Sequence, residues 1–250
     1  MRLPELVVHF DDLLGTANIP DYSGAVNGLQ VECTAEIERV AFAVDAAQAT
    51  IDAAVAAEAN LLVVHHGLFW DGSPAVSGRR YRRLRALIEA NVGLYSAHLP
   101  LDVHPELGNN AVLARELGLE VQGTFGDYKG QAVGVWGALP MRREALAARL
   151  DDLLGCRVRM IAGGPERVER VGIITGGAGG QVNAARSMGL DAFVTGEGAH
   201  HNYFDAMEGG VNLYLAGHYA TETRGVRALS DHTARVCGLE TRFLDHPTGL

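Results

Sequence analysis

The chain has 250 residues, of which 48% are hydrophobic and 20% are charged, a composition typical of a folded protein with one large domain or two smaller ones. Its formal net charge of −9 argues against nonspecific binding to nucleic acid or to an anionic membrane. No apolar run approaches the roughly 20 residues that cross a bilayer.

The N-terminal sequence and the cysteines together predict a reducing compartment. Residues 1–15 show neither a secretory nor a transit pattern. The three cysteines, Cys33, Cys156 and Cys237, are far apart and match no disulfide framework or zinc spacing. We therefore expect a cytoplasmic protein without a cysteine nucleophile.

Strands and helices are expected to alternate along the first half of the chain. Apolar residues recur at helical spacing near the N-terminus, short aliphatic runs predict buried strands, and an Ala-rich segment predicts a helix. The expected elements are helices at 3–14, 46–59 and 109–118 and strands at 38–45, 61–64 and 92–97. This alternation predicts an α/β fold with a mixed, mostly parallel sheet.

The second half repeats the same pattern after a connecting region. That region comprises a strand-like segment at 126–140, a helix at 141–154 and a strand at 157–162. Strands are then expected at 169–177, 191–197 and 211–217, with a helix at 181–189 and a long helix ending near Cys237.

The two halves align with each other, which indicates an internal duplication. Arg39 and His65 are 26 positions apart, as are Arg170 and Gly196, and both segments begin with the letters ERV. A duplicated β-α-β-α-β unit predicts two domains, at residues 1–125 and 126–250. The C-terminal helix and strand are candidates for packing back on the first domain.

Histidines and carboxylates gather where the predicted strands end. Ligand sites of open α/β sheets form at the carboxyl ends of the strands, and imidazole with carboxylate is the donor set of zinc, iron, manganese or nickel. The residues at these positions are His65, His66, His98, Asp102, Glu197, His218 and Glu222. The sequence therefore predicts a metal site.

Two spacings suggest how such a site is built. His218 and Glu222 are four positions apart and share a face if a helix has begun by His218. Gly67 is expected to turn the chain, so that His65 and His66 need not take opposite faces of their strand. Adjacent histidines suit two ions ~3.5–4 Å apart, with Glu222 as a candidate bridge.

The remaining polar motifs have simpler interpretations. The five arginines of residues 79–85 predict the solvated face of a helix, with a phosphate or partner contact as the alternative. The glycines of residues 175–180 predict a tight turn, with anion binding at a helix N-terminus as the alternative. His200 and His201 begin an expected helix and are candidates for a substrate-binding or ligand-orienting role. Four histidines are expected to be structural: His9, His104, His232 and His246.

Several segments together resemble one protein family. The segments are NGLQVE (27–32), VVHHGLFW (63–70), SAHLPLDVHPELGNN (96–110), TGE (195–197) and GHYATE (217–222). They resemble the Nif-three-like dinuclear-metal hexameric proteins, also called GTP cyclohydrolase I type 2 homologues, in the compact form without a central insertion. The resemblance implies two intertwined, duplicated α/β domains and a toroidal homohexamer.

The resemblance also implies a ligand set for two divalent ions per chain. His66 and Asp102 would hold one ion, His65 and His218 the other, and Glu222 would bridge them. His98, Glu197 and His201 remain candidates for proton transfer or for orienting the ligands. The residues do not distinguish zinc, iron, manganese and nickel.

Two functional hypotheses follow. The first is a metal-dependent hydrolase that uses metal-activated water on a small-molecule substrate, with the GTP of the family label as its nucleotide version. The second is a non-catalytic metal-binding assembly, a metal chaperone or a regulatory partner. Open coordination positions favour the hydrolase, because structural metal sites are closed by protein ligands.

Overall fold

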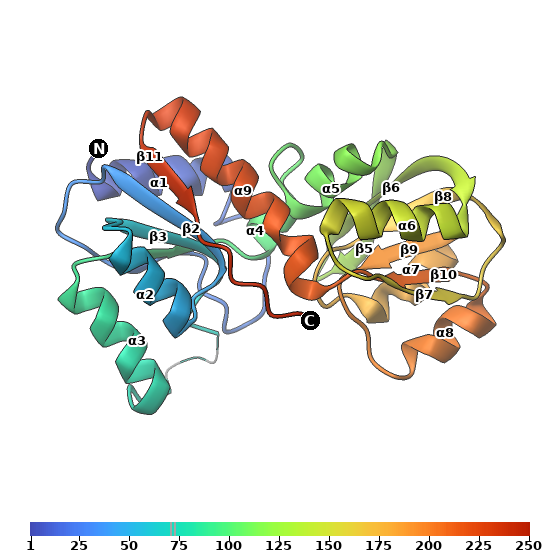
Figure 1. Ribbon diagram of the computed structural model, residues 1–250, viewed down its shortest axis with the longest axis horizontal. Helices are drawn as coiled ribbons and strands as arrows, with labels where there is room; N and C mark the ends of the chain where they lie inside the picture. The colour runs from blue at the N-terminus through green and yellow to red at the C-terminus, as the bar shows by residue number, and fades with distance from the viewer. Residues whose placement is uncertain (71, 73) are drawn as a thin grey trace. The chain divides into compact units, whose positions relative to one another are not determined.

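The computed structural model describes residues 1–70, 72 and 74–250, which form two compact units. The first unit comprises residues 1–104 and 225–246, and the second comprises residues 105–224 and 247–250. Each unit is a sheet covered by helices on both faces (Figure 1). Among the described residues, no helix has both the length and the apolar character needed to cross a bilayer.

The first unit is built on a five-stranded sheet of order β1-β4-β3-β2-β11. Strands β4, β3, β2 and β11 are parallel, and β1 is antiparallel to β4. The strands are β1 (Gly28–Val31), β2 (Arg39–Asp45), β3 (Leu61–His66), β4 (Gly93–Ser96) and β11 (Glu240–Phe243). The helices are α1 (Leu3–Leu14), α2 (Gln48–Ala56), α3 (Gly78–Glu89), α4 (Leu99–Asp102) and the C-terminal part of α9 (His218–Cys237).

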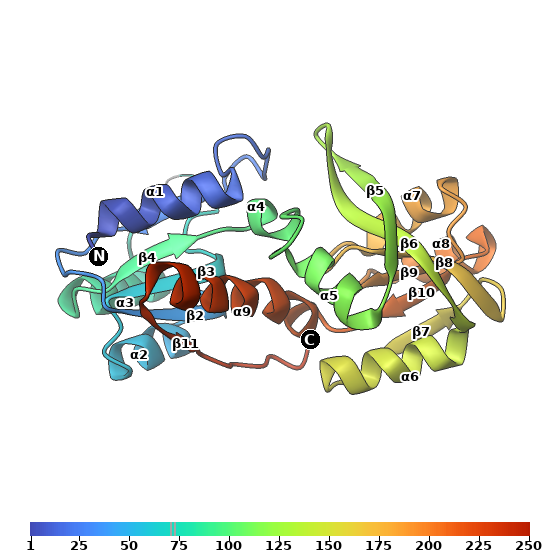
Figure 2. The ribbon, with the colours of Figure 1, turned by 90° about the horizontal axis from the view of Figure 1, so that it is seen from above.

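Alternating side chains of these strands fill two apolar layers. One layer places strand residues such as Ala41 and Leu62 against Ile51 of α2 and Leu87 of α3. On the other face α1 and α9 cover the sheet (Figure 2), and Phe10 packs on Tyr95 with ring centroids 5.2 Å apart. Strands buried on both faces explain why the sequence shows aliphatic runs instead of alternation.

The second unit is built on a six-stranded sheet of order β5-β6-β8-β9-β10-β7. Strands β8, β9 and β10 are parallel, and the other pairs are antiparallel. The strands are β5 (Glu120–Tyr128), β6 (Gln131–Arg142), β7 (Arg159–Ala162), β8 (Arg167–Ile173), β9 (Ala192–Thr195) and β10 (Asn212–Leu215). The helices are α5 (Asn109–Leu117), α6 (Arg143–Leu154), α7 (Val182–Ser187), α8 (Asn202–Gly209) and the start of α9.

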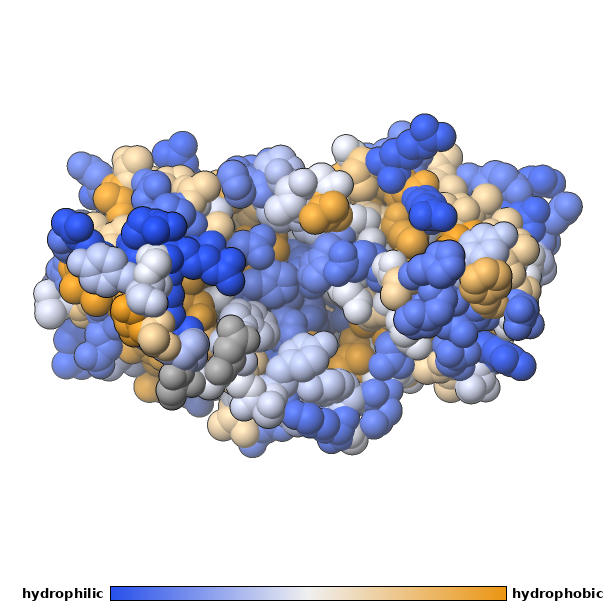
Figure 3. Space-filling model, turned by 90° about the horizontal axis from the view of Figure 1, so that it is seen from below, coloured by the Kyte–Doolittle hydropathy of each residue, from blue (hydrophilic) through white to orange (hydrophobic). Residues whose placement is uncertain are grey.

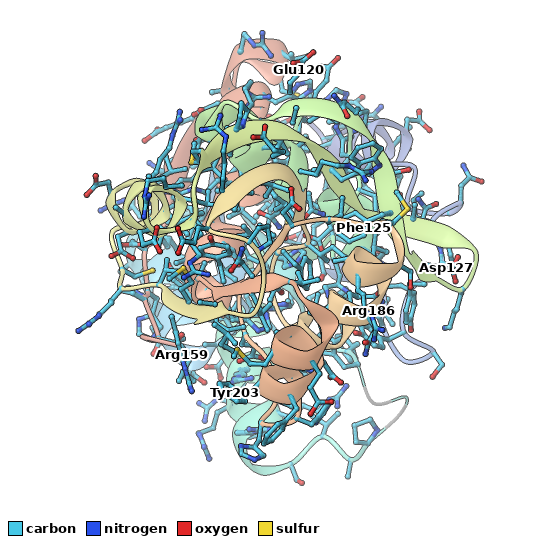
Figure 4. All side chains as sticks on the ribbon, turned by 90° about the vertical axis from the view of Figure 1, so that its right-hand side faces the viewer. Glu120, Phe125, Asp127, Arg159, Arg186 and Tyr203 are labelled. Carbon is cyan, nitrogen blue, oxygen red and sulfur yellow. The ribbon has the colours of Figure 1, made fainter. Side chains whose placement is uncertain are left out.

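Helices cover both faces of the second sheet as well. Leu113 of α5 and Leu150 of α6 belong to one apolar cluster with Val171 and Val194 of the sheet. On the opposite face the rings of Phe125 and Phe193 meet edge to face, with centroids 6.0 Å apart; Figure 4 labels Phe125 on β5.

The predicted duplication is confirmed in the pairing register. Val40 pairs with Leu61, and Leu61 with Gly93. In the second unit Val171 pairs with Ala192, and Ala192 with Asn212. Each third parallel strand also carries an antiparallel neighbour, β1 on β4 and β7 on β10.

One expected strand was wrong. Residues 126–140 were predicted as a single strand-like segment, whereas the structure has an antiparallel hairpin of β5 and β6. Lys129 and Gly130 turn the chain between the strands with φ of 53° and 84°, the left-handed values that two-residue hairpin turns require. Lys is uncommon at such a position, so the turn is hard to recognise from the residues alone.

Candidate metal centre

Both adjacent histidines belong to β3, which runs from Leu61 to His66 and is two residues longer than expected. His65 is fully buried, and its ring centroid lies 4.7 Å from that of His66. The rings lie side by side because each is held by a neighbouring strand: His65 by the residue after β4, and His66 by the last residue of β2.

The expected role of Gly67 was wrong. Its φ is not in the left-handed region, and its backbone instead lies against the side chain of Gln30: a Cβ here would meet Gln30 Nε2 at 2.3 Å. Gln30 Oε1 accepts a hydrogen bond from the backbone N–H of Leu68 at 2.8 Å. The glycine therefore provides space for an amide that fixes the chain after β3, not a turn.

His65 is oriented by a backbone carbonyl. Its Nδ1 lies 2.9 Å from the carbonyl oxygen of Ala97, which can only accept, so Nδ1 carries the proton and Nε2 keeps its lone pair. Nε2 lies 3.6 Å from Asp102 Oδ2. That separation exceeds a hydrogen bond and suits two donor atoms facing one cation.

His66 and His98 are each oriented by a carboxylate. His66 Nδ1 lies 2.8 Å from Oδ1 of Asp45. His98 Nδ1 lies 2.8 Å from Oδ1 of Asp21, whose Oδ2 accepts from Asn27 and from the backbone N–H of Leu99. Burial alone would raise the pKa of Asp21, but the hydrogen bonds from His98 and Asn27 hold that pKa below its usual range.

The three imidazoles form one cluster that fits a metal ion. Ligand atoms of His65, His66 and His98 all lie within 4.8 Å of one another. Metal-binding histidines characteristically donate their second ring N–H to a carbonyl or a carboxylate, which fixes the tautomer. All three histidines of this cluster have such a partner, so the donor set and its orientation fit a divalent transition-metal ion.

Two aromatic rings border this cluster. Trp70 meets His98 edge to face with ring centroids 4.8 Å apart and lies 5.8 Å from His66, while its Nε1 donates to the carbonyl of Gly67. Tyr22 lies 5.5 Å from His98. These rings restrict the rotation of His98 and partly exclude water from it.

The second unit contributes its own donor pair at the start of α9. His218 and Glu222 lie one helical turn apart, as their spacing predicted, and His218 Nε2 is 3.1 Å from Glu222 Oε2. His218 Nδ1 is 2.9 Å from Glu197 Oε1. Burial lowers the pKa of His218, but the hydrogen bonds and charges of Glu222 and Glu197 outweigh it and raise the pKa to about 9.

The glycine-rich turn after β8 shapes this pair. Gly176 has a φ of 69°, and a Cβ on it would lie 2.0 Å from Glu222 Oε1. A Cβ on Gly177 would lie 3.3 Å from Glu197 Oε1. Thr221 further fixes the turn, since its Oγ1 accepts from the backbone N–H of Gly176. The turn is therefore part of the site and lets two carboxylates approach the backbone.

The remaining candidate histidines lie outside these clusters. His201 is the N-cap residue of α8 and is exposed, as are His200 and Tyr203 (labelled in Figure 4); the ring of His200 packs on Phe204. His9 and His232 pair through their Nε2 atoms at 3.1 Å, a contact typical of structural histidines.

Three orienting residues were not predicted from the sequence: Asp21, Asn27 and Asp45. Asp45 offered a usable signal, because it ends a buried strand at the carboxyl edge of the sheet, as His65 and His66 do. Asp21 and Asn27 lie in a loop without periodicity, and Asp21 is 77 positions from His98. No local pattern connects residues so far apart.

The fold and these clusters define a class: a duplicated α/β protein with histidines and carboxylates at the carboxyl ends of its parallel strands. Comparison with known proteins agrees. The family described as Duf34/NIF3 (NGG1p interacting factor 3) matches residues 1–248. The chain belongs to this family.

Individual relatives are similar over their whole length. A GTP cyclohydrolase 1 type 2 homolog of Halobacterium salinarum is 46% identical over 256 residues, covering 100% of both chains. A protein of the same name from Deinococcus radiodurans is 43% identical, covering 98% of this chain and 94% of the relative. A crystal structure from Thermus thermophilus has a TM-score of 0.90 at 40% identity and covers 100% of both chains.

Proposed function

We propose that this protein is a divalent-metal-dependent hydrolase. The observation that carries the proposal is the histidine cluster of the first unit. Three imidazoles offer ligand atoms within 4.8 Å of one another, and each has its Nδ1 held by an acceptor. A histidine that serves only packing needs no such convergence.

The proposed ligand set is that of a dinuclear centre with two ions per chain. It comprises His65, His66 and Asp102 of the first unit with His218 and Glu222 of the second. The donor types suit zinc, iron, manganese or nickel. Support comes from the orientation of the histidines within each unit and from the family to which the chain belongs.

Bound divalent ions would lower the pKa of a water molecule towards ~7 and would polarise the bond of the substrate that water attacks. The chain's own residues do the rest. Asp21 holds the proton on His98 Nδ1, so His98 Nε2 can accept a proton within the cluster. Glu197 holds His218 in the same manner, and Asp45 holds His66.

The proposed substrate is a small molecule with a bond that water can cleave. Curated relatives bear the name GTP cyclohydrolase 1 type 2 homolog, which makes GTP the first substrate to assay. Phosphoesters and amides suit the same chemistry and belong in the same panel.

Metal stoichiometry tests the centre. Protein purified without chelator and measured by elemental mass spectrometry should contain two divalent ions per chain. His65→Ala and Glu222→Ala should each lower that number, whereas His9→Ala should leave it unchanged. One ion per chain or none in the unmodified protein would contradict the dinuclear proposal.

Turnover tests the hydrolase. Metal-loaded protein should hydrolyse GTP or a member of the panel, and Glu222→Ala should abolish the activity. His98→Gln separates two roles, because a proton acceptor would lose kcat with metal retained, and a ligand would lose both. Readily exchanged metal without turnover on any substrate would favour the non-catalytic assembly instead.

We also propose a homohexamer, which is the assembly implied by the family resemblance. Native mass spectrometry of the purified protein at micromolar concentration should give six times the chain mass of 26.6 kDa. A monomer or dimer under those conditions would contradict this part of the proposal.

A further inference from the structure

Helix α3 carries more positive charge than its surroundings balance. Its 12 residues, GRRYRRLRALIE, include five arginines and one acid. Arg85 pairs with that acid, Glu89, at 2.8 Å. Within the described residues, the structure records no ion pair for the other four arginines. In a chain of net charge −9, this helix is a local attractor for anions.

The arginines divide into two groups by burial. Arg79, Arg82 and Arg85 are exposed, as expected for a solvated helix face. Arg80 and Arg83 are half-buried, and the Nε atom of each is shielded from solvent without a hydrogen-bond acceptor among the described residues. A solvated face accounts for the first group but leaves the second unexplained, because a shielded N–H without an acceptor costs free energy.

Helical geometry directs Arg80 and Arg83 towards the body of the first unit. They are three positions apart and stand four positions before Leu84 and Leu87, which are half-buried and fully buried. The face of the first unit that carries α3 shows a dense group of strongly hydrophilic side chains (Figure 3).

Arg80 contacts the segment that carries the histidine cluster, and Arg83 lies near enough to Asp45, on the neighbouring strand β2, to be affected by its charge. The Arg80 guanidinium lies over the ring of Phe69, 4.7 Å from its centroid, and Phe69 follows His66 by three positions. Burial and the neighbouring arginines lower the pKa of Arg83, while the charge of Asp45 raises it. Asp45 is the residue that orients His66.

We propose that Arg80 and Arg83 bind a phosphate group of a small anionic ligand beside the histidine cluster of the first unit. Two guanidinium groups present several N–H donors in planar forks, which match phosphate oxygens in pairs. This assignment rests on the proposed function, since it names phosphate esters as the class of substrate for that site.

Calorimetric titration with inorganic pyrophosphate tests the site without requiring turnover. The full-length protein is first freed of metal with chelator, so that bound ions do not attract the probe. The unmodified protein should bind pyrophosphate. The double variant Arg80→Gln/Arg83→Gln should bind at least about tenfold more weakly, because two charge-assisted forks are lost.

A matched variant separates a specific site from a general field. Arg79→Gln/Arg82→Gln removes the same charge from the exposed side of the same helix, and it should change the affinity by less than about twofold. The single variant Arg83→Lys keeps the charge but loses the planar pair of N–H donors, so its affinity for pyrophosphate should lie between those of the unmodified protein and the Arg80→Gln/Arg83→Gln variant. Equal weakening by both double variants, or absence of binding to the unmodified protein, would overturn the proposal.

Two further measurements keep this inference distinct from the hydrolase. Metal content should be the same in all variants, so a variant that loses both metal and pyrophosphate would contradict a separate phosphate role. Pyrophosphate binding that persists in a protein without any hydrolase activity would retain the site and refute only the proposed reaction. Tighter binding of duplex DNA than of pyrophosphate, lost in both double variants, would also overturn the small-ligand assignment.

Discussion

The two α/β units have the same hydrogen bonds at the amino-terminal ends of their parallel strands and different residues at the carboxyl ends. Asn60 Oδ1 accepts from the backbone N–H groups of Glu38 and Arg39. Asp191, 131 positions later, accepts from those of Glu169 and Arg170.

Equivalent arginines also make the same hydrogen bond in both units. Arg39 donates to the carbonyl of Glu58, and Arg170 to that of Gly189, again 131 positions later. Glu58 and Gly189 both have left-handed φ, of 52° and 64°.

At the opposite edge the same alignment pairs unlike residues. His65 and His66 correspond to Gly196 and Glu197, and Asp45 corresponds to Gly176. The first unit therefore places three imidazoles around its strand ends, while the second places one imidazole among carboxylates. The two units therefore retain the same backbone hydrogen bonds at the amino-terminal ends of their strands, whereas the residues at the carboxyl ends have diverged.

The strongest destabilisation is expected when a side chain is added at the carboxyl edge of the second unit, where the first unit has Asp45 in place of Gly176. Gly176→Ala puts a methyl group where the Glu222 carboxylate lies and forces alanine into a left-handed φ. We expect a loss of about 3 kcal/mol in the free energy of unfolding, measured by urea titration. Gly180→Ala is the control, because nothing lies within 4 Å of its Cβ position. Equal stability of the two variants would refute the tight packing of Glu222.

Removing one imidazole from the first unit tests the other side of the comparison. His65→Ala should weaken zinc affinity by about 100-fold or more, since a ligand contributes at least as much as the groups that orient it. Competition with a fluorescent chelator measures the affinity. His9 belongs to the same unit but lies outside the cluster, so His9→Ala should leave the zinc affinity unchanged. An equal loss of affinity in His9→Ala would refute the assignment of His65 as a metal ligand.

The stability of the second unit should depend on pH through His218, which lies between the carboxylates of Glu197 and Glu222. His218 has a pKa of about 9 when folded and about 6.5 when unfolded. The stabilisation it contributes is therefore complete below pH 6.5 and is lost as pH rises through 9. In metal-free protein the free energy of unfolding should fall by about 3 kcal/mol across that window. His218→Gln should flatten the curve, and an unchanged slope in that variant would assign the effect elsewhere.

The two units should respond most alike when the equivalent acceptors at the amino-terminal ends of their strands are removed. Asn60→Ala and Asp191→Ala each remove one acceptor from two backbone N–H groups. Each should cost about 1–2 kcal/mol of unfolding free energy, with the two values within about 0.5 kcal/mol of each other. Parallel urea titrations give both values. A large disparity between them would break the equivalence of the two edges.

Connectivity adds a feature that the alignment alone does not show. The helix that follows β4 and α4 is α5, which belongs to the second unit, while the helix that follows β10 is α9, most of which belongs to the first. Strand β11 then pairs with β2. Each unit is therefore completed by chain that follows the third parallel strand of the other.

The parallel strands, their duplication and the ligand-type residues at their ends could all be predicted from the amino-acid sequence. An aliphatic run of a few residues indicates a strand that is buried on both faces. The carboxyl ends of parallel strands lie at one edge of the sheet, so residues that follow such runs are expected at that edge. The i, i+4 relation of His218 and Glu222 likewise follows from helical periodicity. Apart from the duplication, which requires a comparison of segments 131 positions apart, these features can be recognised within a window of a few residues.

The groups that orient the histidines could be identified only from the three-dimensional structure. Asp21 reaches His98 across 77 positions and Asp45 reaches His66 across 21, and Gly67 is small because Gln30, from another strand, lies against it. Packing of strands distant in sequence creates these contacts, and periodicity carries no information about them. Which lone pairs point into the cluster therefore depends on the fold, although the residues that bear them can be recognised beforehand.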